Sequence, residues 1–253
     1  IELCLVGSEM CIRDRFMITK NEIKRIKSLQ NKKDRKELQL FVAEGEKTVH
    51  DLLKSGWIAE SIYVTESFGN AKEKLISSKE MERISSLKSS SSVLGVFRIP
   101  IQQSFSHEGR ILALDGVTDP GNLGTIIRLC DWFGIATLIC SLDTVDCYNP
   151  KVVQATMGSL SQVNCVYTDL VSFLKKTDKP IYGTLLAGSS VYDEPLDSEG
   201  ILLLGSESHG LSEEVKAYIK HAITIPRFGS EEGAESLNVA IAAAIVLGQA
   251  FRV

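Results

Sequence analysis

From Ile111 to Ile225 the sequence alternates short, mostly apolar runs with longer segments of helical periodicity. Apolar runs of four to six residues are typical of strands buried on both faces, as in a parallel sheet covered by helices. They span residues 111–114, 136–140, 163–167, 181–186, 201–204 and 222–225. The alternation therefore predicts an α/β fold with a mainly parallel, doubly wound sheet.

The residues before this series form a smaller pattern of alternating helices and strands. Helices are expected over 18–29 and 70–87 and from the segment 44–46 onward, and strands over 40–43, 61–65 and 93–99. A polar stretch without periodicity covers 101–109 and is expected to be a linker between domains at 17–100 and 110–253. Residues 1–16 lack the features of a signal peptide and precede Met17, so we expect a non-native leader.

Charge is divided unevenly between these two parts. The net charge of the chain is -4, yet residues 17–100 carry a net +5 and residues 101–253 a net -8. The positive side chains are densest near the start, at Lys20, Lys24, Arg25, Lys27, Lys32, Lys33, Arg35 and Lys36. Such a cluster either binds nucleic-acid phosphates or is a solvated helix face, and the candidate phosphate ligands are Lys24, Lys32, Lys33 and Arg35.

Several classes of function lack their sequence signals. No apolar run is long enough to span a bilayer, and the six cysteines include no Cys-x-x-Cys pair or zinc-like spacing. We therefore expect a cytoplasmic protein with free buried thiols and no metal. A P-loop and a Gly-x-Gly-x-x-Gly fingerprint are both missing, and GSESHG does not match a nucleophile elbow.

Three unusual loops follow predicted strands, where ligands bind in open parallel sheets. They lie in LALDGVTDPGNLGTIIRLCDWFG (112–134), LLLGSESHGLS (202–212) and IPRFGSEEGAESLNVAIAAAIVLGQ (225–249). In the first, the apolar stripe of the helix leaves Arg128 free to point elsewhere. In the third, Ser236 is the expected N-cap of the final helix.

In this order the three segments resemble the SpoU/TrmH family of RNA ribose methyltransferases, within the SPOUT group, over residues 110–251. FVAEGEKTVHDLL, at 41–53, resembles the RNA-binding module of that family. The resemblance implies a trefoil knot in the catalytic domain, a smaller N-terminal α/β RNA-binding domain, and S-adenosylmethionine (SAM) as the cofactor. It also implies transfer of a methyl group to a ribose 2′-hydroxyl.

The resemblance also implies which residues form the site. Gly205, Ile225 and Leu237 match the positions that contact SAM, and the catalytic and RNA-site positions match Asn122, Arg128, Glu207, Ser236 and Asn238. An arginine keeps its proton at neutral pH and is therefore a poor general base, so two roles stay open for Arg128: it either accepts the hydroxyl proton or binds a phosphate.

Other substrates and functions are compatible with the sequence. The basic first domain favours rRNA over tRNA as the substrate, and a catalytically silent RNA-binding relative or an enzyme acting on a small molecule are the remaining alternatives. The segment 237–251 is apolar on all sides, which predicts burial either against both its own sheet and a second subunit or entirely within one subunit. The family also implies a homodimer.

Overall fold

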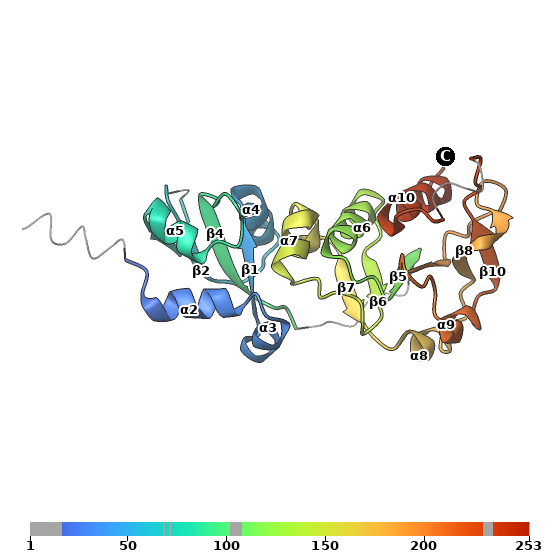
Figure 1. Ribbon diagram of the computed structural model, residues 1–253, viewed down its shortest axis with the longest axis horizontal. Helices are drawn as coiled ribbons and strands as arrows, with labels where there is room; N and C mark the ends of the chain where they lie inside the picture. Colours follow the sequence, from blue (N-terminus) through green and yellow to red (C-terminus); the bar gives the residue numbers. More distant parts are fainter. Residues whose placement is uncertain (1–16, 68, 71, 102–107, 230–234, 253) are drawn as a thin grey trace, which may run out of the picture. The chain divides into compact units, whose positions relative to one another are not determined.

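The computed structural model describes residues 17–67, 69–70, 72–101, 108–229 and 235–252. The chain divides into two compact units, and Tyr148–Ser161 belongs to the first of them together with the residues up to Ile101. Each unit has a sheet of its own (Figure 1). The expected leader at 1–16 and residues 102–107 of the expected linker lie outside the described residues.

The first unit is built on a four-stranded sheet with the strand order β1-β4-β2-β3. Its central strand β4 pairs antiparallel with both β1 and β2, and β3 pairs parallel with β2. The strands are β1 (Leu40–Glu44), β2 (Ala59–Val64), β3 (Glu73–Leu75) and β4 (Val93–Arg98). Three of them occupy the regions where the sequence predicts strands, and β3 is an addition.

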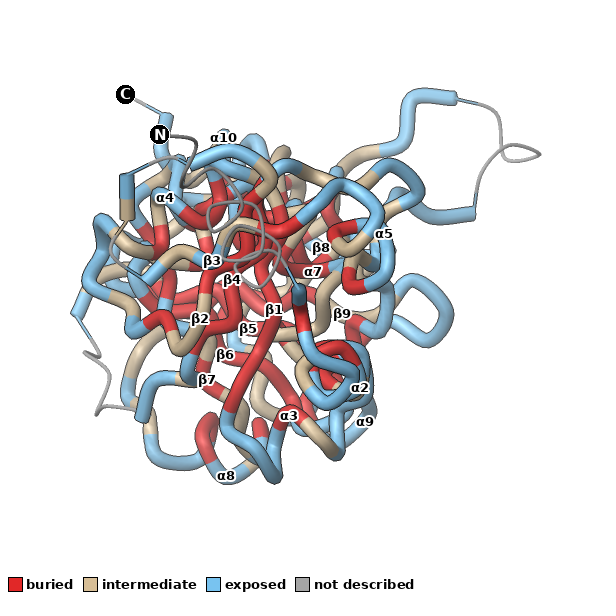
Figure 2. Tube along the Cα trace, turned by 90° about the vertical axis from the view of Figure 1, so that its left-hand side faces the viewer, coloured by how far each residue is buried: buried red, intermediate tan, exposed pale blue. Residues whose placement is uncertain are grey.

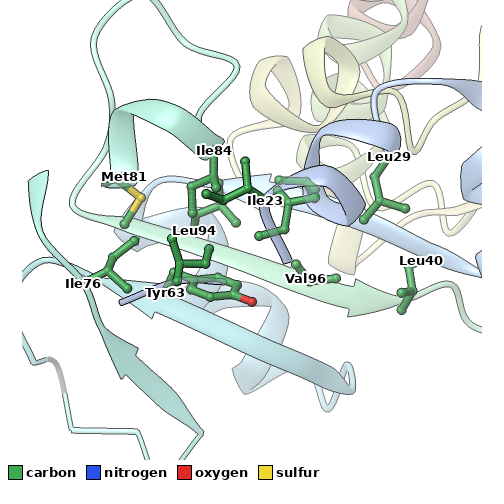
Figure 3. Packing of buried hydrophobic residues seen from close by; sticks show 12 residues of the cluster. Ile23, Leu29, Leu40, Tyr63, Ile76, Met81, Ile84, Leu94 and Val96 are labelled. Carbon is green, nitrogen blue, oxygen red and sulfur yellow. The ribbon is translucent and has the colours of Figure 1, made fainter. Parts of the chain in front are cut away.

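Two helices cover one face of this sheet, α2 (Lys20–Ser28) and α5 (Ser78–Ile84). Both begin with a capping box, in which Thr19 and Glu22, or Ser77 and Glu80, satisfy backbone N–H groups in pairs. Figure 3 shows the apolar core of this face, where Ile23 and Ile84 lie near Leu94. Burial of each such side chain stabilises the fold by about 1.5–3 kcal/mol.

The predicted helix over 70–87 is wrong in its first half. Glu73–Leu75 forms β3, and the backbone N–H of Ile76 donates to the carbonyl oxygen of Val64 at 2.8 Å. Pairing with the buried strand β2 satisfies these backbone groups, and the Ser77 cap starts the helix later than its apolar periodicity suggests. A charged helix that the sequence did not signal, α3 (Lys32–Leu38), follows α2.

The opposite face carries α4 (Glu46–Lys54) and the segment Tyr148–Ser161, which includes α7 (Pro150–Thr156) and a short 3-10 helix, η2 (Ser159–Ser161). The ring of Tyr148 lies 5.1 Å from that of Phe41, centroid to centroid, and Trp57 meets the same Phe41 ring edge-on. Aromatic pairs in this geometry add stability beyond the area that they bury. The segment is thus part of the core of the first unit, although it lies between two strands of the second sheet in the sequence.

The second unit is built on a six-stranded sheet with the order β10-β8-β9-β5-β6-β7, in which every described strand pair is parallel. The prediction of a mainly parallel α/β sheet is confirmed. The strands are β5 (Ile111–Asp115), β6 (Thr137–Cys140), β7 (Asn164–Tyr167), β8 (Ile181–Ser190), β9 (Ile201–Gly205) and β10 (His221–Thr224).

Helices cover both faces of this sheet, as the apolar runs predict. On one face α8 (Leu170–Leu174) and α9 (Glu213–Lys216) pack against a cluster that includes Ile111, Ala113 and Leu203. Their neighbours along the strands point the other way, toward α6 (Pro120–Trp132) and α10 (Val239–Ala250). Figure 2 shows the central strands buried along their length.

No helix in the described part of the chain is long and apolar enough to cross a membrane. Four cysteines are described and all are free thiols, namely Cys130, Cys140, Cys147 and Cys165. Burial raises the pKa of the Cys130, Cys140 and Cys147 thiols, which keeps them protonated and unreactive. Across the described residues, no group of three or more His, Cys, Asp or Glu side chains is arranged to hold a metal ion.

Candidate active site

The three loops singled out in the sequence follow β5, β9 and β10 of the second sheet. Because parallel strands end at a common edge, the loops 116–119, 206–212 and 225–238 all start from one side of the sheet. Asn122 is 85 positions from Glu207 in the sequence, and Glu207 is 31 positions from Asn238. A site composed of residues from separate segments is therefore expected at this edge of the sheet.

Three of the predicted catalytic residues meet there. The Glu207 carboxylate accepts hydrogen bonds through one oxygen, Oε1, from Nδ2 of Asn122 at 3.0 Å, from Nδ2 of Asn238, and from the backbone N–H of Val239 at 3.3 Å. Nδ2 of Asn238 also lies 2.9 Å from Oδ1 of Asn122. The structure thus joins Asn122 in the first turn of α6, Glu207 in the loop after β9 and Asn238 at the start of α10 in a polar cluster, here called the Asn122–Glu207–Asn238 cluster.

Helix caps place the two asparagines. Asp119 is the N-cap of α6, and its carboxylate accepts a hydrogen bond from the backbone N–H of Asn122 at 2.8 Å. Asn238 is the N-cap of α10, where Oδ1 accepts from the N–H groups of Ala240 and Ile241. The amide of Asn238 therefore has two tasks, because its oxygen caps the helix while its nitrogen donates to Glu207.

The prediction that Ser236 caps the last helix is wrong. The helix begins at Val239 and its cap is Asn238, two residues later. Asparagine is as good an N-cap as serine, so the polar pair Ser236 and Asn238 left the start ambiguous in sequence. Ser236 is exposed and precedes the helix, next to Leu237, whose side chain is 47% exposed.

The loop after β9 is folded tightly on itself. The backbone N–H groups of Ser206 and Gly210 each donate to the other residue's carbonyl oxygen, at 3.0 and 2.8 Å. Gly210 has a φ of +68°, and a Cβ atom at Gly205 would overlap the backbone of Gly210 and Leu211. Glycine is therefore required at Gly205 for space and is favoured at Gly210 by the backbone conformation.

Arg128 lies apart from the Asn122–Glu207–Asn238 cluster. It is six residues beyond Asn122 on α6, a rotation of about 240° around the helix axis, so the two side chains leave the helix on different sides. Arg128 is exposed, and within the described residues its guanidinium makes no hydrogen bond or ion pair. The expectation that it lies off the apolar stripe is confirmed, while its role in the site stays a prediction.

Ile225, a predicted cofactor position, and Thr184, which the sequence did not indicate, lie just beyond β10 and on β8, the two strands on one side of β9. Ile225 is half-buried and follows β10 directly, on the same edge as Gly205. Thr184 is on β8, which lies between β9 and β10 in the sheet, and its buried hydroxyl has no hydrogen-bond partner among the described residues. A buried hydroxyl left unpaired costs about 1–3 kcal/mol, so a bound group that satisfied it would be stabilised there.

One of the predicted RNA ligands is a structural residue instead. The Arg35 side chain is 1% exposed, and its Nη1 donates to the carbonyl oxygens of Leu29 at 2.9 Å and Gln30 at 2.8 Å, just past α2. A guanidinium with those partners cannot reach a phosphate, so this prediction is corrected. Lys24 on α2 and Lys32 and Lys33 on α3 are exposed.

The sequence reasoning missed Asp115, the last residue of β5. Its side chain is only 9% exposed, and Oδ2 accepts from both the backbone N–H and the hydroxyl of Ser212, at 2.7 and 2.8 Å. A signal was present, because a carboxylate that ends a fully apolar strand must find partners when it is buried. The last residue of the loop 206–212 is thus hydrogen-bonded to the end of β5.

Comparison with protein-family models divides the chain as its charge pattern does. Residues 109–248 match the model of the SpoU rRNA Methylase family, and residues 20–95 match that of an MRM3-like substrate binding domain. The second match lies inside the expected domain 17–100, and the first begins at the last residue of the expected linker 101–109 and otherwise lies inside the expected domain 110–253.

The relatives resemble the chain at different lengths. The 23S rRNA (guanosine(2553)-2′-O)-methyltransferase RlmP of Bacillus subtilis is 30% identical over 89% of this chain and 94% of its own length. The 23S rRNA (uridine(2479)-2′-O)-methyltransferase of Streptomyces viridochromogenes is 34% identical over 61% of this chain, and the match spans 55% of that relative.

Solved structures match both units. A TrmH-family protein from Porphyromonas gingivalis is 36% identical, with a TM-score of 0.83 over 92% of this chain and 98% of that one. An rRNA methyltransferase from Sinorhizobium meliloti, solved with bound AdoMet, which is SAM, is 30% identical, with a TM-score of 0.81 over 94% of this chain and 96% of that one.

Proposed function

This chain belongs to the SpoU rRNA methylase family, and on that basis we propose that it transfers a methyl group from SAM to a ribose 2′-hydroxyl of ribosomal RNA. The observation that carries the proposal is the Asn122–Glu207–Asn238 cluster, in which all three family segments meet. The substrate follows from the relatives, since those of Bacillus and Streptomyces are both named for 2′-O-methylation of 23S rRNA.

The cofactor site lies at the ends of β8, β9 and β10. Backbone groups of Gly205, Ile225 and Leu237 bind SAM, and the unpaired hydroxyl of Thr184 supplies a further hydrogen bond. Backbone donors and acceptors suit the neutral edge of an adenine, which asks for no charged side chain. No metal takes part, and calorimetric binding of SAM is expected to be unchanged by a chelator.

SAM supplies a methyl group that is already activated on a sulfonium. The protein therefore has to hold the ribose oxygen in line with that methyl group and assist the loss of the hydroxyl proton. Asn122, Ser236 and Asn238 orient the nucleotide by hydrogen bonds, and Glu207 fixes both asparagines. Arg128 either accepts the proton or binds the phosphate beside the reacting ribose.

RNA is held first by the smaller domain, residues 17–100, through Lys24, Lys32 and Lys33. Their ammonium groups are exposed on adjacent helices. In this proposal the linker 101–109 joins this domain to the catalytic domain at 110–253, from which only Tyr148–Ser161 packs with the first unit. We place the activity in the cytoplasm, where ribosomal RNA is present.

A trefoil knot and a homodimer complete the proposal. The knot is supported by the order of the elements, since β9 is central in the sheet, β10 is at its edge, and α10 packs against α6 and β9. For the dimer, the supporting observation is that α10 is apolar throughout and yet leaves Ile241 52% exposed, where a second subunit would cover it.

Incubation of total RNA with the protein and labelled SAM, followed by mapping of 2′-O-methylated positions, tests the function. We expect one or a few labelled riboses in 23S rRNA. Label in tRNA alone would identify the tRNA-directed alternative, and RNA binding without any transfer would identify a catalytically silent relative.

A further inference from the structure

The loop that follows β9, residues 206–212, carries the residue on which the polar cluster depends. Glu207 reaches out of this loop to both asparagines, and Gly205 at its start is a proposed cofactor contact. A loop of this length would lose conformational entropy on binding a ligand unless it were already ordered. Contacts that order the loop before the cofactor binds therefore lower the entropy cost of binding.

Two sets of bonds hold the loop. The first is internal, the reciprocal hydrogen bonds between Ser206 and Gly210. The second comes from outside, because the Asp115 carboxylate accepts two hydrogen bonds from Ser212. Asp115 also pairs with Gly205 in the parallel register of β5 and β9. The backbone of Asp115 therefore lies beside Gly205, which directly precedes the loop, and its side chain binds Ser212, the last residue of the loop.

The hydrogen bonding of the Ser212 side chain indicates that this residue serves the contact with Asp115 and not the capping of a helix. Ser212 occupies the N-cap position of α9, yet its side chain makes no capping bond there. Its hydroxyl donates to Asp115 instead. A serine at this position ordinarily stabilises a helix by satisfying one of its free N–H groups, and here that stabilisation is given up for an attachment to β5.

We propose that Asp115 is a positioning residue for cofactor binding, whose carboxylate holds the loop 206–212 in its binding conformation through Ser212. This inference depends on the proposed function for the identity of the ligand. Hydrogen bonds to an ionised acceptor are the stronger kind, and this carboxylate is nearly buried, so it is screened little by water. Without it the loop keeps its internal bonds, the bonds of Glu207 and the packing of Leu211, which is 1% exposed in the core, but loses the polar attachment of its last residue to β5.

The test compares Asp115→Asn with Asp169→Asn. Asp169 is a matched control because it follows β7 at the same edge of the sheet and accepts the backbone N–H of a serine, Ser172, but does not contact the loop. Calorimetry is expected to show a SAM Kd raised about tenfold by Asp115→Asn and unchanged by Asp169→Asn. The KM for SAM should rise in parallel, while kcat at saturating SAM stays within about threefold, because the reacting groups are intact.

Hydrogen exchange without cofactor separates a positioning role from a general loss of stability. The amides of Ser206 and Gly210 should exchange about tenfold faster in Asp115→Asn, and the amides of β5 and β6 should not change. If Asp115→Asn does not fold, Ser212→Ala removes one of the two bonds and Ser212→Thr restores it. We expect loss of SAM affinity in the first and recovery in the second.

Some outcomes would overturn the inference. Unchanged SAM affinity and unchanged loop exchange in both Asp115→Asn and Ser212→Ala would show that the loop holds its conformation without Asp115, as would faster exchange spread evenly over the whole sheet. Failure of the wild-type protein itself to bind SAM would instead refute the proposed cofactor. The two failures are therefore distinguishable.

Discussion

At the scale of single residues, Asn238 combines a structural and a proposed catalytic task in one amide. Asn238→Ser keeps a cap oxygen for α10 but removes the nitrogen that donates to Glu207 and Asn122. We expect normal thermal stability and at least a hundredfold lower kcat. Asn238→Ala should lose the activity and also about 1 kcal/mol of stability. Near-normal turnover in the serine variant would remove Asn238 from the site.

Substitutions at Arg128 distinguish between its two proposed roles, as the general base and as a phosphate ligand. Arg128→Ala should abolish most methyl transfer while leaving the fold and SAM affinity unchanged, because the side chain is exposed and unpaired among the described residues. Arg128→Lys keeps a positive charge with a lower pKa. A phosphate ligand predicts partial recovery through KM for RNA, and a base predicts a shifted pH profile of kcat. Full activity of the alanine variant would contradict both roles.

The Glu22 carboxylate makes the stability of the first unit depend on pH. Burial on its own would raise the pKa of Glu22, but hydrogen bonds from Lys74 Nζ and from the backbone and hydroxyl of Thr19 outweigh it and lower the pKa to about 2, from an ordinary 4.5. A depressed pKa in the folded state contributes stability above pH 4.5 that is lost as the pH falls toward 2.

Glu22→Gln should therefore destabilise the first unit at pH 6, and the difference from the wild type should shrink between pH 4.5 and 2. Urea unfolding followed by the fluorescence of Trp57, in a Trp132→Phe background, measures it. Glu37→Gln, at an exposed position on α3, is the control. A difference between wild type and Glu22→Gln that does not depend on pH would contradict the assignment.

At the scale of elements, α2 and α3 carry the proposed RNA surface. Reversal of charge at Lys24, Lys32 and Lys33 should lower RNA affinity and reduce the slope of log K against log salt, because fewer counterions are released on binding. SAM affinity should not change. The matched control reverses Lys47, Lys54 and Lys79, which are exposed on other helices of the same unit. An equal effect of both triple variants would mean that net charge, and not this surface, binds the RNA.

At the scale of the whole molecule, the proposed dimer predicts a mass of twice 27.8 kDa in sedimentation at low micromolar concentration. The final helix is apolar throughout, as its sequence suggests, but the structure buries only part of it and leaves Ile241 half exposed. Ile241→Arg should therefore give monomers with an intact fold, since it adds charge to an exposed position. A wild-type monomer that methylates RNA would refute the dimer.

The sequence by itself determined the parallel sheet and the three loops that carry the candidate site. Its signals there are local, since a doubly buried strand reads as an apolar run and a ligand loop at a strand end contains glycine, proline and asparagine. The meeting of Asn122, Glu207 and Asn238 followed from that topology, because parallel strands end at one edge.

Only the tertiary structure decided the features that depend on partners distant in the sequence. It gave residues 73–75 to a strand by pairing them with β2, buried Arg35 against two carbonyl oxygens, and moved the last helix cap from Ser236 to Asn238. It also packed Tyr148–Ser161 into the first unit through Phe41 and Trp57. The physical reason is common to all of them: whether a polar group is satisfied or an apolar ring is covered depends on which other segment reaches it.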